Sequence, residues 1–145
     1  MIELQGERAY PQGKAALEAK LNDMGFIVSC VPDRAQTKSV TPDRAEVTIR
    51  PGFSFVRGEL AVTIERMAAQ PPYASSLLLK TKGIGSSAEV VASFAVEDAG
   101  TGSKVKWKAS VTQLGGLLKA VPGGLIQAAA QKTIEEMLKG VEGRV

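Results

Sequence analysis

The side chains that most often perform catalysis or bind metals are scarce in this sequence. The chain has no histidine and one cysteine, Cys30. Without histidine there is no imidazole base, no Ser-His triad and no usual zinc ligand. One cysteine forms neither an internal disulfide nor a CxxC metal site. We therefore expect no metal and no cofactor, and we expect Cys30 to pack as a small buried residue.

Any acid or base catalyst would have to be a carboxylate, lysine or tyrosine that faces the interior. Glu89 and Glu97 lie at strand edges in the pattern, and neither has an evident inward orientation. Gly83-Ile84-Gly85 lacks the strand–GxGxxG–helix context of a dinucleotide loop and is expected to connect two strands. The sequence therefore predicts a protein that is not an enzyme.

Composition and charge narrow the class of protein further. Of 145 residues, 44% are hydrophobic and 23% are charged, which is typical of a soluble globular protein and predicts one domain over residues 1–145. Eighteen Lys and Arg against fifteen Asp and Glu give a net charge of +3 without basic runs, so we expect no nucleic-acid partner. Met1-Ile2-Glu3-Leu4 is unlike a signal peptide and no apolar run matches a membrane span, which predicts a cytoplasmic protein.

The N-terminal segment predicts a strand followed by two short helices. Apolar and polar residues alternate from Ile2 to Ala9, whereas Gln12 to Leu21 has helical spacing. Asn22-Asp23 is a turn pair that can cap a second helix from Met24 to Cys30, which Pro32 ends.

A period of two residues then dominates to about Gln113. Alternation is clearest around Val47, from Leu60 to Ile64 and from Val105 to Val111, and glycine and proline separate these segments. The pattern predicts an antiparallel meander of about six further strands, with a hairpin turn at Gly100-Thr101-Gly102. Lys104, Lys106 and Lys108 are expected on a solvated outer face; weak attraction to anionic lipid or an acidic partner is the alternative.

Helical spacing returns at the C-terminus, where a helix of about 39 Å is predicted from about Gly116 to Val141. Pro122-Gly123-Gly124 predicts a kink or a break, and Lys139-Gly140 predicts the C-terminal stop. This helix is the one predicted element long enough to cover the apolar face of the sheet.

A curved sheet closed by one helix leaves a space unless large side chains fill it. Aromatic residues make up only 5% of the chain, and the helix has small residues at Gly123, Gly124 and Ala128 to Ala130. We therefore expect a cavity that binds an apolar molecule such as a lipid or quinone; a filled core is the alternative. The residues expected to line it are Val56, Leu60, Val62, Val105, Trp107, Ala109, Val121, Leu125 and Ala129.

Phe53 and Phe55 share a side of their strand, with a parity opposite to that of Val56 and Leu60. A bulge near Gly58 would place both rings in the core. Alternatively, they form an exposed aromatic pair that serves a homodimer or another partner surface.

Four segments in order resemble the motifs of one protein family. Leu21-Asn22-Asp23 with Cys30-Val31-Pro32 is similar to an "LND…CIPG" stretch, with Asp33 in place of the glycine. Gly52 to Gly58 with Leu60-Ala61-Val62 resembles a glycine-bounded strand, and Pro71-Pro72-Tyr73 a "PP.Y" turn. Gly116 to Ile126, Ala129 to Lys132 and Glu135-Glu136 resemble the helix "GKLAQLGSRLI…AARK..DD". On these residues the chain resembles the carbon monoxide dehydrogenase CoxG family, in the START / polyketide-cyclase-like (SRPBCC) superfamily.

This resemblance implies an α+β helix-grip fold. In such a START-like fold a curved antiparallel sheet of about six to seven strands surrounds a long C-terminal helix, two short helices follow the first strand, and a hydrophobic-ligand cavity lies between sheet and long helix. Relatives are thought to assist molybdenum-containing carbon monoxide dehydrogenases, in maturation or in linking the enzyme to the membrane and its quinone pool.

The resemblance thus implies a non-catalytic accessory protein that binds a lipid or quinone-like ligand. A molybdoenzyme partner and a peripheral contact at the inner face of the membrane are further expectations. The alternatives are an interaction adaptor with an incidental cavity and an enzyme of the cyclase or hydrolase type. This chain departs from the family pattern at Leu17, near a usual tryptophan, and at Pro122, where relatives carry glycine.

Overall fold

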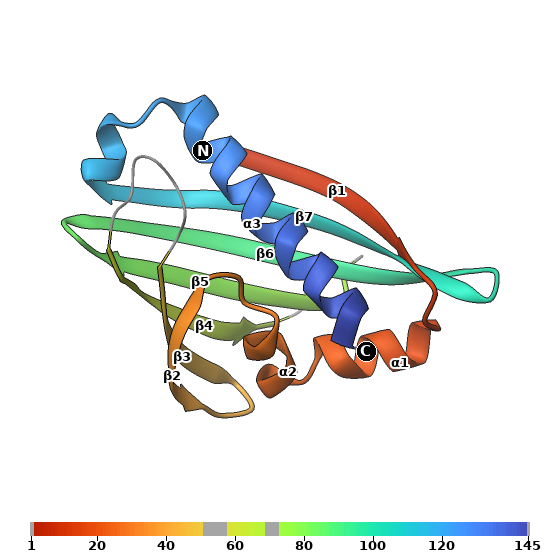
Figure 1. Cartoon of the computed structure of the whole chain (residues 1–145). Coiled ribbons are helices and arrows are strands. Elements are labelled where there is room, and N and C mark those ends of the chain that lie inside the picture. Colours follow the sequence, from red (N-terminus) through yellow and green to blue (C-terminus); the bar gives the residue numbers. More distant parts are fainter. Residues whose placement is uncertain (1, 51–57, 69–72, 145) are drawn as a thin grey trace.

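Seven antiparallel strands form one curved sheet, and a long helix crosses one face of it (Figure 1). The computed structural model describes residues 2–50, 58–68 and 73–144. The elements, in chain order, are β1 (Ile2–Tyr10), α1 (Lys14–Leu21), α2 (Met24–Ser29), β2 (Arg34–Val40), β3 (Arg44–Ile49), β4 (Leu60–Met67), β5 (Ser75–Gly83), β6 (Ser86–Ala99), β7 (Gly102–Gly116), the 3-10 helix η1 (Leu117–Ala120) and α3 (Gly123–Arg144).

The strand order in the sheet is β1-β7-β6-β5-β4-β3-β2. Consecutive strands from β2 to β7 therefore pair with each other, and β1 joins the sheet beside β7. This is the predicted meander, and the two short helices lie between β1 and β2, where the sequence predicted them. The predicted helix-grip architecture is confirmed, and so are the turns at Gly100-Thr101 and at Ile84-Gly85.

The two short helices form because each has an apolar face and a defined start. The side chain of Asp23 accepts a hydrogen bond from the amide of Phe26 at 3.3 Å, so it caps α2 as predicted. Helix α1 begins at Lys14, two residues later than expected, with Gly13 at its N-cap. Leu17 of α1 and Ile27 of α2 are fully buried, which attaches both helices to the core.

The predicted C-terminal helix is divided in two. Residues Leu117–Ala120 form η1, and α3 begins at Gly123. The carbonyl of Pro122 accepts the amides of Leu125 and Ile126 at 3.0 and 3.2 Å, so the proline lies immediately before the first turn of α3. The predicted break at Pro122-Gly123-Gly124 is therefore confirmed.

The predicted stop at Lys139-Gly140 is wrong, because α3 continues to Arg144. Glycine inside a helix costs about 1 kcal/mol relative to alanine. Val141, one residue later, is fully buried, and burying a valine side chain contributes about 1.5 kcal/mol or more. Tertiary packing beyond Gly140 therefore outweighs its poor helix propensity.

Polar contacts fix the C-terminal half of α3 to β1. The buried hydroxyl of Tyr10 donates a hydrogen bond to the carbonyl of Leu138 at 2.7 Å. Nη2 of Arg8 lies 2.5 Å from Oε2 of Glu142, and the side-chain amide of Gln12 donates to the Glu142 carbonyl at 3.2 Å. This end of the helix is thus held by directional bonds as well as by apolar packing.

Replacing Tyr10 with phenylalanine is expected to lower stability by about 1 kcal/mol, the usual worth of one buried hydrogen bond. Burial raises the pKa of the Tyr10 hydroxyl above its ordinary value. Because an unfolded tyrosine ionises near pH 10, its stabilising contribution is complete below about pH 10 and is lost as the pH rises above that value. Urea unfolding of both proteins from neutral to alkaline pH checks this.

The two proteins should therefore converge in stability at alkaline pH. Burial also raises the pKa of the Cys30 thiol, but this contribution is common to both proteins and cancels in their difference. A stability difference that stays constant from pH 7 to above pH 10 would contradict the assignment of the alkaline loss to Tyr10.

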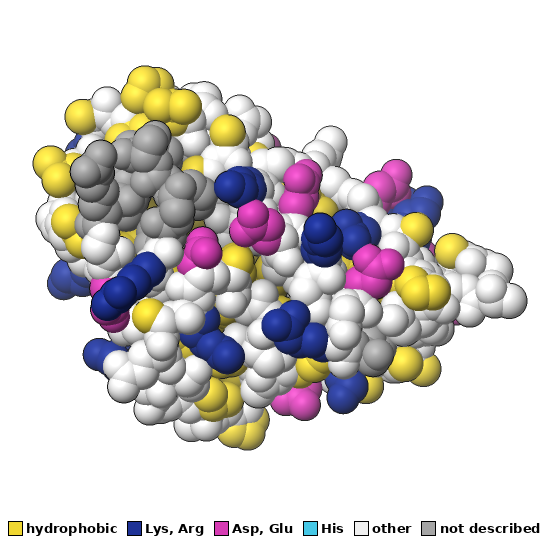
Figure 2. All heavy atoms as spheres, viewed as in Figure 1, with side chains coloured by type: hydrophobic (Ala, Val, Ile, Leu, Met, Phe, Trp, Pro, Cys, Tyr) yellow, Lys and Arg dark blue, Asp and Glu magenta, His cyan; other side chains and the backbone are white. Residues whose placement is uncertain are grey.

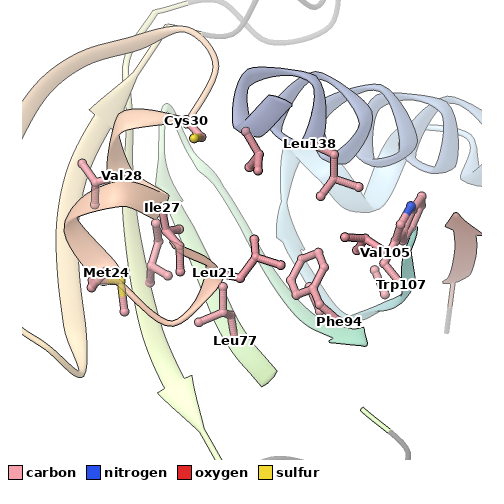
Figure 3. Packing of buried hydrophobic residues seen from close by; sticks show 14 of the residues in the cluster. Leu21, Met24, Ile27, Val28, Cys30, Leu77, Phe94, Val105, Trp107 and Leu138 are labelled. Carbon is pink, nitrogen blue, oxygen red and sulfur yellow. The ribbon is translucent and has the colours of Figure 1, made fainter. Parts of the chain in front are cut away.

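The buried residues divide into a large and a small apolar cluster. Figure 3 shows part of the large one, in which Phe94, Val105 and Trp107 of the sheet face Leu138 of α3. Gly6 of β1 makes room for this packing, since a Cβ there would lie 2.7 Å from the Trp107 ring. The small cluster consists of Val111, Leu118 and Ile126 near the start of α3. Val90 and Ala130 pack against both clusters.

The outer face of the sheet is charged, as predicted. Lys104 Nζ lies 3.5 Å from Glu7 and Lys106 Nζ lies 3.4 Å from Glu97, while Lys108 is exposed. Phe53 and Phe55 lie outside the described residues, so both interpretations of this pair stay predictions. No helix among the described residues has the length and hydropathy that crossing a membrane requires.

Candidate functional site

An apolar cavity of about 190 Å³ lies between the sheet and α3. Strands β4 to β7 form its floor and α3 its roof, with Ile27 of α2 and Leu118 of η1 at its margins. It separates the two apolar clusters, because residues of both line it. The sheet contributes Ile49, Leu60, Ile64, Leu77, Leu79, Thr81, Ala88, Val90, Ala92, Phe94, Val111 and Leu114.

The roof is one continuous stripe of α3. Its lining residues are Ile126, Ala129, Ala130, Thr133, Ile134 and Met137, which recur at spacings of three and four. This spacing places all six side chains on one face of a helix. Alanine occupies two adjacent positions of the stripe, and these short side chains leave the volume that a larger residue would fill.

A bulge lets two residues of β7 line the floor. Val111 and Leu114 are three positions apart, so in a regular strand they would point to opposite faces. The β6–β7 register shifts between Glu89 and Val90, and the extra residue, Thr112, lies opposite that step on β7. The bulge therefore directs both side chains into the cavity.

The cavity wall offers almost no free polar group. Thr81 and Thr133 are the two residues with hydroxyls in the lining. Oγ1 of Thr133 donates to the Ala129 carbonyl at 2.8 Å, and Oγ1 of Thr81 donates to the Ala88 carbonyl at 3.4 Å. Because the main chain already takes both hydroxyl protons, the wall presents an apolar surface to any ligand.

The cavity is small for a whole lipid. Drug-sized ligands occupy pockets of about 300–1,000 Å³, whereas an apolar cavity of about 150 Å³ stays dry and binds benzene. The volume of about 190 Å³ therefore suits one ring or a short alkyl segment.

The structure places the residues predicted to line the cavity in four ways. Leu60 and Ala129 line it. Val62, Val105, Trp107 and Ala109 point inward but are buried in the large cluster. Val121 packs against the small cluster at the edge, and Val56 lies outside the described residues. Leu125 differs from expectation, because its side chain is 51% exposed.

The break before α3 explains Leu125. The stripe Val121–Leu125–Ala129 assumed one unbroken helix, but α3 starts afresh after Pro122 and Ile126 takes the inward position. The correct stripe has a sequence signal, since six residues from Ile126 to Met137 fit one helical face. On β5, the uninterrupted apolar run Leu77-Leu78-Leu79 hides the alternation that places Leu77 and Leu79 in the cavity.

Carboxylates lie away from the cavity. Glu97 pairs with Lys106 on the outer face, and Glu89 is half-buried outside the lining, with the inward-facing Ala88 and Val90 on either side of it. Among the described residues there is no cluster of carboxylate, thiol or imidazole groups that could hold a metal ion. The described lining thus supplies contact area and a size limit rather than acid, base or nucleophile.

Comparisons with known proteins agree with this architecture. Residues 6–145 match the model of the carbon monoxide dehydrogenase subunit family CoxG. A conserved protein from Geobacillus kaustophilus has a similar solved structure, with a TM-score of 0.84 at 17% identity over 98% of this chain and 93% of that chain. A START superfamily protein from Mycobacterium smegmatis gives a TM-score of 0.68 at 12% identity, over 99% and 96%. These structural likenesses show a START-like fold. No curated protein sequence matches the chain significantly.

Proposed function

Because the chain belongs to the CoxG family of carbon monoxide dehydrogenase, we propose that it is a non-catalytic accessory protein that binds an apolar ligand between the sheet and α3. The observation that carries this proposal is the lining, which is apolar except for two hydroxyls that already donate to the main chain. An enzyme of the cyclase or hydrolase type would need a reactive group at the cavity, and the described lining has none.

The chemistry of the wall favours a hydrocarbon chain over a polar ring. A quinone ring carries two carbonyl oxygens, and burying them without hydrogen-bond donors would cost several kcal/mol, on the order of 2–7 per group. A hydrocarbon segment has no such cost, and it fits a volume of about 190 Å³. The proposed ligand therefore inserts the end of an acyl or isoprenoid chain and leaves its polar headgroup outside.

Native mass spectrometry of the gently purified protein is expected to show a co-purified apolar mass that organic extraction releases. Titration with decanol should shift the methyl NMR signals of Ile126 and Ile134, which line the cavity, and leave those of the exposed Val40 unchanged. An empty protein whose Ile126 and Ile134 signals do not respond to decanol would contradict ligand binding.

An adaptor role is the second candidate function, and family membership favours it. The family is named for a carbon monoxide dehydrogenase, so a molybdoenzyme of that class is the proposed partner, at the cytoplasmic face of the membrane. Affinity purification should then retain dehydrogenase subunits. An empty cavity together with retained subunits would support the adaptor over the ligand carrier.

A further inference from the structure

The exposed large hydrophobic side chains gather at one end of the molecule. Of the four such residues described, Ile84, Leu117 and Leu125 are 44%, 66% and 51% exposed at this end, and Val40 lies on the edge strand β2. The amide of Leu117 donates to the carbonyl of Gly85 at 3.0 Å, which joins η1 to the β5–β6 turn. Figure 2 shows hydrophobic side chains concentrated at the end where β5 and β6 meet in Figure 1. We call Ile84, Leu117 and Leu125 the apolar tip.

The apolar tip forms the outside of the cavity wall. Leu118 and Ile126 line the cavity and belong to one buried cluster, and each is adjacent in sequence to an exposed leucine, Leu117 or Leu125. The wall at this end is therefore apolar on both surfaces. A hydrocarbon chain that approached the tip would reach the cavity without passing a charged layer.

Ile84 occupies the tip at a conformational cost. Its φ angle is +54°, in the left-handed region that β-branched residues rarely adopt. Glycine or asparagine would relax this position, so nothing in the turn itself requires a branched apolar residue. A strained residue at a prominent position is a reason to look for a function in its side chain.

The charges around the tip are positive. Segments 81–88 and 114–131 contain Lys82 and Lys119 and no aspartate or glutamate. Both lysines are exposed, and neither forms an ion pair with a described residue. Glu59, whose main chain lies against Gly83, already pairs with Arg50 at 3.0 Å. Protruding aliphatic groups beside unpaired lysines complement an anionic lipid surface.

The same segments lack what a protein interface usually contains. Binding hot spots are enriched in Trp, Tyr and Arg, and segments 81–88 and 114–131 contain no aromatic residue and no arginine. We propose that the apolar tip, with Lys82 and Lys119, docks on an anionic lipid bilayer and turns this end of the cavity toward the acyl chains. The docking deepens the proposed function, which supplies its purpose.

Vesicle flotation tests the docking. The wild type should float with vesicles of phosphatidylcholine and phosphatidylglycerol, and should bind phosphatidylcholine alone more weakly. The double variant Leu117→Ser/Leu125→Ser should lose about tenfold in vesicle affinity, because two leucines no longer insert. Lys82→Gln/Lys119→Gln should reduce binding to the anionic vesicles selectively, and high salt should mimic it. Val40→Ser, which removes an equally exposed apolar side chain elsewhere, should bind like the wild type.

Decanol binding by each soluble variant separates docking from ligand binding. Vesicle affinity that falls while the Ile126 shift by decanol persists supports docking by the tip. Equal vesicle binding by wild type and Leu117→Ser/Leu125→Ser overturns it, as does a wild type that binds no vesicle. Loss of a captured protein in that variant, without vesicle binding by the wild type, would assign the tip to a protein partner instead. Vesicle binding without decanol binding would leave docking intact and refute the proposed ligand cavity.

Discussion

Ala130→Phe is expected to weaken ligand binding at least about 100-fold, a change of about 2.7 kcal/mol in binding free energy. Ala130 lies in the α3 stripe, lines the cavity and packs against both apolar clusters. Phenylalanine there adds a ring of the size of benzene, which fills most of a cavity of this class. Decanol titration followed by the methyl signals of Ile126 and Ile134 measures the loss.

Stability should move little or rise in the same variant. Filling a cavity typically contributes about 0.5–2 kcal/mol, so the melting temperature should stay or increase. Ala128→Phe is the matched control, because Ala128 is exposed on the same helix and the added ring would point to solvent. Decanol affinity in Ala128→Phe should equal that of the wild type. Unchanged affinity in Ala130→Phe would show that the ligand binds elsewhere.

Gly116→Ala is expected to destabilise the protein by about 3 kcal/mol or more, through overpacking and an unfavourable backbone conformation together. Gly116 joins β7 to η1 with a φ of +61°, and a Cβ there would lie 1.8 Å from the carbonyl oxygen of Gly85. Main chain faces main chain at this contact, so no side chain can turn aside. Thermal unfolding should show a melting temperature lower by about 10 °C.

Gly100→Ala separates the two causes of that loss. Gly100 has a φ of +66°, but a Cβ there would meet nothing within 4 Å. This control retains the backbone penalty of about 1–2 kcal/mol and lacks the clash. Equal destabilisation of the two variants would contradict the close approach of β7 to the β5–β6 turn. A larger effect in Gly116→Ala should also release Leu117 from Gly85 and disturb the apolar tip.

The sequence determined the local elements, because their signals are carried by neighbouring residues. Alternation in Val105–Val111 predicts the strand that β7 contains, and the polar-to-apolar change after Asn22-Asp23 predicts α2. Pro122 predicts the division before α3, since proline has no amide to donate and fixes its own φ. Burial of one strand face also follows, because parity assigns each apolar residue to a side.

The position of the cavity along the sheet was beyond these signals. Val105, Trp107 and Ala109 face inward as predicted, yet the C-terminal half of α3 packs directly on this region, and the space remains under the N-terminal half. Parity gives the side of a sheet and says nothing about how closely another element approaches it. The bonds of Tyr10 and Arg8 to α3 set that approach, and they join residues more than 120 positions apart.

Only the tertiary structure decided the phase of α3, the inward turn of Leu114 and the end of the helix. The phase depends on where a helix restarts after Pro122, and a shift of one residue exchanges Leu125 for Ile126. Leu114 depends on a bulge defined by two strands together, and the helix end depends on burial of Val141 beyond a glycine. Each outcome is a balance between a local preference and contacts made by distant residues, and packing free energy exceeds local propensity at all three places.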